Sequence, residues 1–166
     1  MYTEPFVERV QQGDTLTLHL FAPYQTLRLD TYEEVDVRNA TIWESGLSVL
    51  TYVRNLGGGA SERTLTGYNI VPVKGSIRYD SRNVLRISFV RGQQGFVFEA
   101  KVVLTERGVA RFSHLRAIGW MNRRCDKIYF TPLIGGPGQN EHLIFEFLQL
   151  TPHFYQWQNH LYVKVE

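Results

Sequence analysis

Hydrophobic and polar residues alternate along most of this chain. The cleanest example is 15–21, which places leucines at every second position. Successive side chains of a strand point to opposite faces, so this segment predicts a half-buried β-strand. Residues 11–14 before it are typical of a turn, and Pro23 after it lacks the backbone N–H that a strand ladder needs. The chain therefore opens with a turn and one amphipathic strand.

The same two-residue period recurs in short runs that are separated by turn residues. Turns are predicted at 92–95 and 106–108, and the three glycines at 57–59 predict a hairpin tip. Further strands are predicted at 27–29, 47–53, 69–73, 84–90, 96–104, 109–112, 127–131, 143–150 and 160–165. This spacing is typical of a β-sandwich or a barrel, and we expect an all-β fold, a two-sheet antiparallel sandwich of the jelly-roll type. The length of the chain predicts a single domain over 1–166.

Two stretches lack the alternation. Residues 117–126 contain Gly119 and predict a turn or an irregular loop. The glycine-rich segment 135–140 predicts a long surface loop or the connection to a last hairpin. Charges inside strands are expected on solvent faces or at sheet edges, because they oppose pairing with other chains. These charges are Arg86, Glu99, Lys101 and Lys164.

Composition agrees with an ordinary globular protein. Hydrophobic residues make up 43 % of the chain and charged residues 20 %, which argues against disorder. Cys125 is the single cysteine, so no internal disulfide forms, as is usual in a reducing compartment. The first ten residues lack the apolar segment of a signal peptide, and no stretch approaches the roughly 18 apolar residues of a membrane span. We therefore expect a soluble protein without a membrane span, either cytoplasmic or exported by a non-classical route.

No pattern of residues predicts catalysis or a metal site. The histidines lack the spacing of zinc ligands. Arg123, Arg124 and Lys127 would favour the thiolate of Cys125, but no base or oxyanion site is identified beside it. The glycines at 57–59 are not followed by the lysine and hydroxyl residue of a phosphate-binding loop. We expect a protein that is not an enzyme and that uses no metal and no cofactor.

The segment 111–127 is the most suggestive binding candidate. It contains one acid, Asp126, among many basic and polar residues, which are Arg111, His114, Arg116, Trp120, Asn122, Arg123, Arg124 and Lys127. Arginine binds anionic groups through paired hydrogen bonds, and an indole stacks on a sugar or a base. The segment predicts a site for an acidic glycan, a nucleic acid or an acidic protein, with a solvated basic loop as the commoner explanation of such a run. The net charge of +2 does not by itself imply a polyanionic partner.

The strand pattern resembles the galectin family. Residues 10–23 resemble the family's opening strand, and 27–30 resemble its next strand. Residues 88–104 are similar to its P-F-x-x-G turn and the strand beyond, and 106–114 to its N-G hairpin and F-x-H-R strand. In this register the resemblance covers about residues 5–133, while a second register would place 143–150 and 160–165 on those same family strands. The resemblance implies a galectin-like sandwich, the fold of a family that binds β-galactosides.

The galectin sugar-binding motif is mostly absent. Leu50-Thr51-Tyr52-Val53-Arg54 stands where the family has H-x-N-x-R, so only Arg54 matches. Tyr79 falls near the position of the stacking tryptophan, and the W-G-x-E-x-R pattern is missing. Groups that match a sugar hydroxyl give most of the discrimination between sugars. The resemblance therefore implies a diverged member that binds another glycan or a protein.

Three hypotheses about function follow. The first is a carbohydrate-binding or adhesion module, in which Trp43 and Tyr52 stack on a sugar and Arg54 bonds its hydroxyls. The second is a structural or oligomerising protein, such as a scaffold or coat-like domain, that pairs with a protein partner or with its own copies. The third is a binder of an acidic partner through 111–127, whose affinity would fall steeply with salt; nucleic acid is the least favoured of these partners.

Overall fold

The computed structural model describes most of the chain. The described residues are 1–5, 7–27, 33–54, 60–64, 66–80, 84–114, 117–121, 126–130, 140, 142–143 and 160–166. Among them, only the backbone is described for 27, 41–44, 53–54, 60, 62–64, 114, 117–121 and 126–130.

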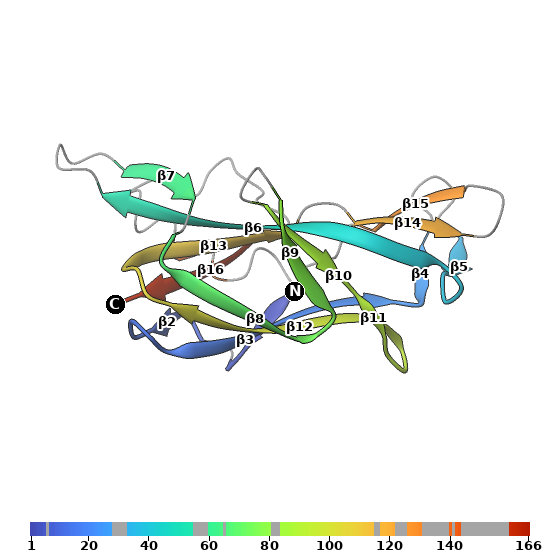
Figure 1. The fold of residues 1–166 in the computed structure, drawn as a ribbon, viewed down its shortest axis with the longest axis horizontal. Coiled ribbons are helices and arrows are strands. Elements are labelled where there is room, and N and C mark those ends of the chain that lie inside the picture. Colours follow the sequence, from blue (N-terminus) through green and yellow to red (C-terminus); the bar gives the residue numbers. More distant parts are fainter. Residues whose placement is uncertain are drawn as a thin grey trace.

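Two β-sheets lie one above the other (Figure 1). The smaller, which we call sheet A, has five strands joined by antiparallel pairing. Its order is β1 (Tyr2–Glu4), β3 (Thr15–Pro23), β12 (Gly95–Leu104) and β11 (Val90–Arg91), and β8 (Tyr68–Lys74) also pairs with β12. The predicted strands at 15–21, 69–73 and 96–104 are confirmed here.

The larger sheet, which we call sheet B, has nine strands. Its order is β15 (Asp126–Phe130), β14 (Ala117–Met121), β6 (Thr41–Arg54), β13 (Gly108–His114), β16 (His160–Val165) and β2 (Arg9–Val10). Two more strands pair with β6, namely β7 (Ala60–Thr64) and β10 (Leu85–Ser88). The last strand, β9 (Ser76–Tyr79), pairs with β10. A separate two-stranded ribbon consists of β4 (Gln25–Leu27) and β5 (Glu34–Asp36).

The core lies between the two sheets. It is built from alternate side chains of each strand, because the other side chains point away from the partner sheet. Sheet A contributes Leu16, Leu18, Leu20, Phe98, Ala100, Val102 and Leu104, and sheet B contributes Leu47, Val49, Leu85, Ile87, Phe112, Leu161, Val163 and Val165. Each large aliphatic or aromatic side chain removed from water stabilises the fold by about 1.5–3 kcal/mol. The all-β sandwich predicted from the alternation is confirmed.

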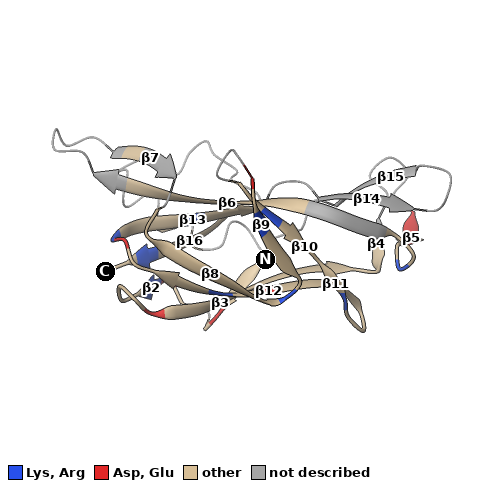
Figure 2. Cartoon of the chain, viewed as in Figure 1, with Lys and Arg blue, Asp and Glu red and all other residues tan. Residues whose placement is uncertain are grey.

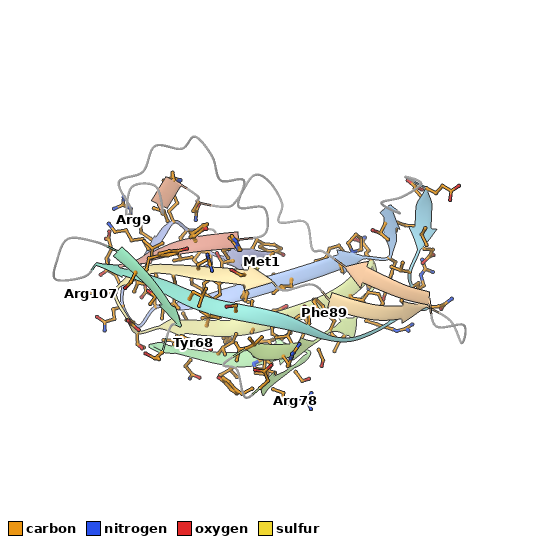
Figure 3. All side chains as sticks on the ribbon, turned by 90° about the horizontal axis from the view of Figure 1, so that it is seen from above. Met1, Arg9, Tyr68, Arg78, Phe89 and Arg107 are labelled. Atoms are coloured by element: carbon orange, nitrogen blue, oxygen red, sulfur yellow. The ribbon has the colours of Figure 1, made fainter. Side chains whose placement is uncertain are left out.

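A second, smaller core joins the β4–β5 ribbon to the end of sheet A. It contains Tyr24, Val37 and Phe96, all buried. Phe89, labelled in Figure 3, packs against both this cluster and the main core, with its ring edge-on to that of Phe98 at 6.3 Å. The ribbon is therefore packed onto the sandwich rather than tethered only by its chain ends.

Three local expectations are corrected. The turn at 106–108 does not close a hairpin, because β12 lies in sheet A and β13 in sheet B, so the turn carries the chain between sheets. The loop expected over 117–126 contains the strand β14, which pairs with both β15 and β6; a register shift beside Gly119 explains why its alternation is broken. Leu143, expected to begin a strand, has helical backbone, and 144–150 lie outside the described residues.

Pro72 shows why the predicted strand 69–73 tolerates a proline. Among the described strands, β8 pairs only with β12, and the register shifts between Glu99 and Ala100, beside the position that Pro72 pairs with. In an edge strand with such an irregularity, a missing backbone N–H costs little stability, because few ladder hydrogen bonds depend on it. In the part of the chain that the structure describes, no helix is long and apolar enough to cross a membrane.

Candidate functional site

The outer face of sheet A, which points away from the core, is the most exposed apolar part of the described structure. Six large hydrophobic side chains are exposed among the described residues, and five of them belong to strands of sheet A. The five are Tyr2, Phe21, Val71, Val73 and Val90, and the sixth is Tyr79 of β9. Exposed apolar side chains that gather among polar ones mark binding surfaces more often than singly scattered ones do. This face is therefore the candidate binding surface.

A hollow of about 500 Å³ lies at one end of this face, where β3, β11 and β12 meet. Three apolar side chains and four polar ones line it, together with Gly92. They are Phe21, Val90 and Val97, and Lys74, Arg91, Gln93 and Gln94. Its volume lies within the roughly 300–1,000 Å³ that is typical of small-ligand sites, and its lining mixes apolar and polar groups.

Strand register brings the apolar wall together. Val97 of β12 pairs with Phe21 of β3 on one side and with Val90 of β11 on the other. Side chains directly opposite each other on one face of a sheet are in contact range. The three residues therefore form one row across three strands, with Phe21 40 % exposed and Val90 41 % exposed.

Gly95 makes room for the Phe21 ring. A Cβ atom at Gly95 would lie 2.7 and 2.9 Å from two ring carbons of Phe21, and it would collide with the carbonyl oxygen of Ala22. The ring therefore lies against the bare backbone at the start of β12. A side chain at this position would displace the ring, so Gly95 positions the largest apolar group of the hollow.

Tyr24 holds the turn that forms the polar wall. Its hydroxyl donates to the carbonyl of Gly92 at 2.8 Å, and its backbone N–H donates to the carbonyl of Gln94 at 3.1 Å. The turn is closed by the Gly92 N–H, which donates to the Gly95 carbonyl at 2.8 Å, so the turn predicted at 92–95 is confirmed. Tyr24 is itself fixed by an edge-on contact with Phe96, at 5.1 Å between ring centres. The wall is thus pre-formed by buried contacts.

Two cations complete the lining, and Figure 2 shows basic segments at β11 and at the end of β8. Arg91 donates to the carbonyl of Ala40 at 3.2 Å, and its guanidinium lies over the ring of Phe96 at 5.9 Å. Lys74 donates to Glu99 at 2.8 Å. Arg91 pairs with buried Phe96, so its guanidinium lies on the core-facing side of sheet A, whereas Lys74 contacts Glu99 on the outer face beside the hollow.

A row of polar side chains continues from Lys74 across the sheet. Glu99 lies 3.7 Å from His19, and the other ring nitrogen of His19 lies 3.3 Å from Glu4. Tyr2 stacks on the imidazole, with 4.7 Å between ring centres. Glu99, one of the four charges expected on a solvent face or sheet edge, thus lies here in contact with other charged groups, and 16 % of its side chain is exposed.

Acid is expected to weaken the pair of Lys74 and Glu99. The hydrogen bond from the Lys74 ammonium lowers the pKa of Glu99, and the same bond raises the pKa of Lys74. A carboxyl whose folded pKa is lowered stabilises the fold above its unfolded pKa, about 4.3, and this contribution is lost as the pH falls through the folded pKa. The difference in unfolding free energy between wild type and Glu99→Gln, from urea titrations, should therefore shrink between about pH 7 and about pH 3. A difference that does not change with pH would contradict the assignment.

None of the residues that the sequence put forward as a site is among the described residues that line this hollow. Tyr52 is 6 % exposed, packs with Val109, Leu143 and Tyr162, and its hydroxyl accepts from Arg111 at 2.9 Å. Its ring is therefore not free to stack on a sugar, which corrects the role expected of it. Trp43 and Arg54 of β6, His114 of β13 and Trp120 of β14 are described by backbone alone, and Arg116, Asn122, Arg123 and Arg124 lie outside the described residues.

Arg111 also differs from the expected solvated cluster. It is 8 % exposed, and its guanidinium lies 5.7 Å from the centre of the Tyr52 ring. The start of the 111–127 segment is thus part of a buried polar layer on the outer face of sheet B. The same layer holds a 2.8 Å contact between the Ser113 hydroxyl and Nδ1 of His160.

The sequence carried one signal for the hollow that the expectations did not use. Phe21 falls on the polar side of an alternating strand, the side that also carries Thr17 and His19. A large aromatic residue at such a position is exposed unless something covers it. Residues 90–97 form the rest of the hollow only because β12 pairs with β3. The alternation within one strand does not predict which strand pairs with it.

No protein family, curated protein or solved structure matches the chain. The resemblance to galectins therefore stays a prediction that depends on the strand residues quoted above. The hollow and its lining are accordingly interpreted from their own chemistry.

Proposed function

We propose that this protein is a non-catalytic binding module that holds a saccharide in the hollow between β3, β11 and β12. The observation that supports this most is the exposed ring of Phe21 beside the two amides of Gln93 and Gln94. A pyranose ring offers an apolar C–H face and a rim of hydroxyls. An aromatic ring packs on that face, while amide groups both donate to and accept from hydroxyls.

The edges of sheet A favour recognition by its face. On one side, β8 carries Pro72 and a register shift, which remove regular pairing sites for another strand. On the other side, β1 has three residues and is followed directly by Pro5. A scaffold that assembles by edge-to-edge pairing of sheet A is therefore disfavoured, and the exposed apolar groups lie on the face instead.

This proposal keeps the carbohydrate-binding hypothesis and moves its site. The aromatic and polar groups come from Phe21 and the 92–95 turn, in place of Tyr52 and its neighbours on β6. Adhesion through a glycan, as the resemblance to galectins implies, would use the same hollow. Assembly with a second copy is the main competing outcome, and light scattering at the protein concentration used for binding distinguishes it.

Phe21→Ala is expected to weaken saccharide binding by about tenfold or more. Loss of a stacking ring removes both its buried area and its ring contact, together about 1.4 kcal/mol or more. The measurement is screening of the wild type on a glycan array, then titration calorimetry of the best glycan with both proteins. Val71→Ala is the matched control, because Val71 is an exposed apolar residue of sheet A that does not line the hollow.

Two results would overturn the proposal. One is an array without any bound glycan at high protein concentration. The other is equal affinity for Phe21→Ala and the wild type, which would place binding elsewhere on the molecule.

A further inference from the structure

We infer that the saccharide extends beyond the hollow, and that its next unit stacks on the ring of Tyr2. This inference rests on the proposed function and adds a second subsite to it, so that the ligand is an oligosaccharide of at least two units. Its basis is a second exposed aromatic ring on the outer face of sheet A, beside the exposed carboxylate of Glu4.

Strand pairing places Tyr2 beside the hollow. Tyr2 of β1 pairs with His19 of β3, and Phe21 follows His19 by two residues on the same face of β3. Tyr2 and Phe21 are therefore diagonal neighbours, whose α-carbons lie about 7–8 Å apart in a regular sheet. Tyr2 is 42 % exposed and Phe21 is 40 % exposed. Two sugar units joined by a glycosidic bond are long enough to cover both rings.

The ring of Tyr2 leans over the sheet towards the hollow. One face of the ring stacks on the imidazole of His19, with 4.7 Å between ring centres and 11° between planes. The hydrogen bond to Glu99 is the main cause of the raised pKa of Lys74, and the phenol of Tyr2, which ionises in the same range, adds to it. The phenol therefore lies near the Lys74 ammonium, and Lys74 lines the hollow. The ring face opposite the imidazole is left for a ligand.

Glu4 supplies the hydrogen-bond acceptor that a sugar unit on Tyr2 requires. It follows Tyr2 by two residues on the exposed face of β1, and one of its oxygens lies 3.3 Å from Nε2 of His19. Because 63 % of its side chain is exposed, its carboxylate retains further acceptor sites. Hydroxyls form stronger hydrogen bonds with a carboxylate than with a neutral acceptor. A pyranose on Tyr2 would thus meet both an apolar ring and a charged acceptor.

The experiment compares the best glycan of the array with shorter versions of it, down to the single unit that binds best. The wild type should bind the two-unit glycan about tenfold more tightly than the single unit, the gain expected of one stacking contact. Tyr2→Ala should lose this gain and keep the wild-type affinity for the single unit, which also shows that the hollow is intact. Phe21→Ala should weaken binding at every length. Titration calorimetry measures the affinities.

Two further tyrosine variants serve as controls. Tyr2→Phe keeps the ring and should keep the gain, and its loss in that variant would refute stacking. Tyr79→Ala removes an exposed tyrosine from sheet B and should bind every length as the wild type does. No gain from the second unit in the wild type, or an equal loss at every length in Tyr2→Ala, would overturn the inference and leave the proposed function standing. An array without any bound glycan would overturn both.

Discussion

Replacing Phe98 by alanine is expected to lower the free energy of unfolding by about 3–5 kcal/mol. Phe98 is fully buried in the middle of β12, opposite Leu20, and its ring contacts Phe89 edge-on. Truncation removes the transfer energy of the ring and leaves a cavity between two sheets that cannot close without moving their strands. A loss of this size is a large fraction of the stability of an ordinary domain.

Urea unfolding followed by tryptophan fluorescence and by circular dichroism measures the effect. Phe21→Ala is the internal control, because it removes the same side chain from the opposite face of the same sheet, where 40 % of the residue is exposed. The control should cost far less stability while it reduces glycan binding. Similar losses in the two variants would contradict the assignment of one phenylalanine to the core and the other to the binding face.

The fold was predictable where alternation alone decides it. The leucines of β3 and the apolar residues of β12 have a two-residue period, and both strands bury that side against sheet B. It was harder to predict which strands pair, because the chain passes from β12 in sheet A to β13 in sheet B and forms no hairpin between them. A turn such as 106–108 has the same composition in either case, so its sequence does not determine where the next strand pairs.

The site was less predictable than the fold, for a physical reason. Basic and aromatic residues close together in sequence drew attention to 111–127, but Arg111 is buried beneath its neighbours on sheet B. The hollow instead combines Phe21 with a turn about seventy residues further along the chain, held by Tyr24. Contacts between distant segments depend on the order of strands in the sheet. That order cannot be predicted from one sequence when the strand pairing is unknown.

Gly75→Ala is expected to destabilise the fold by about 2–4 kcal/mol, because it combines backbone strain with a steric clash. Gly75 joins β8 of sheet A to β9 of sheet B and has a φ of +91°, in the region that side chains disfavour. A Cβ atom there would collide with the carbonyl oxygen of Ser88 and lie 3.0 Å from the Phe98 ring. The backbone oxygen cannot move aside without shifting the end of β10, so the clash adds to the strain.

Gly13→Ala separates the two causes. Gly13 has nearly the same φ, +95°, but nothing lies within 4 Å of a Cβ built at that position. Its substitution should therefore cost only the strain of the left-handed backbone, about 1–2 kcal/mol. Urea titrations of both variants measure the difference, and equal losses would show that backbone conformation alone, without crowding, limits residue 75. A larger loss at Gly75 would instead show that the passage between the sheets is packed as tightly as the core beside it, which would explain why the chain places a glycine beside Phe98.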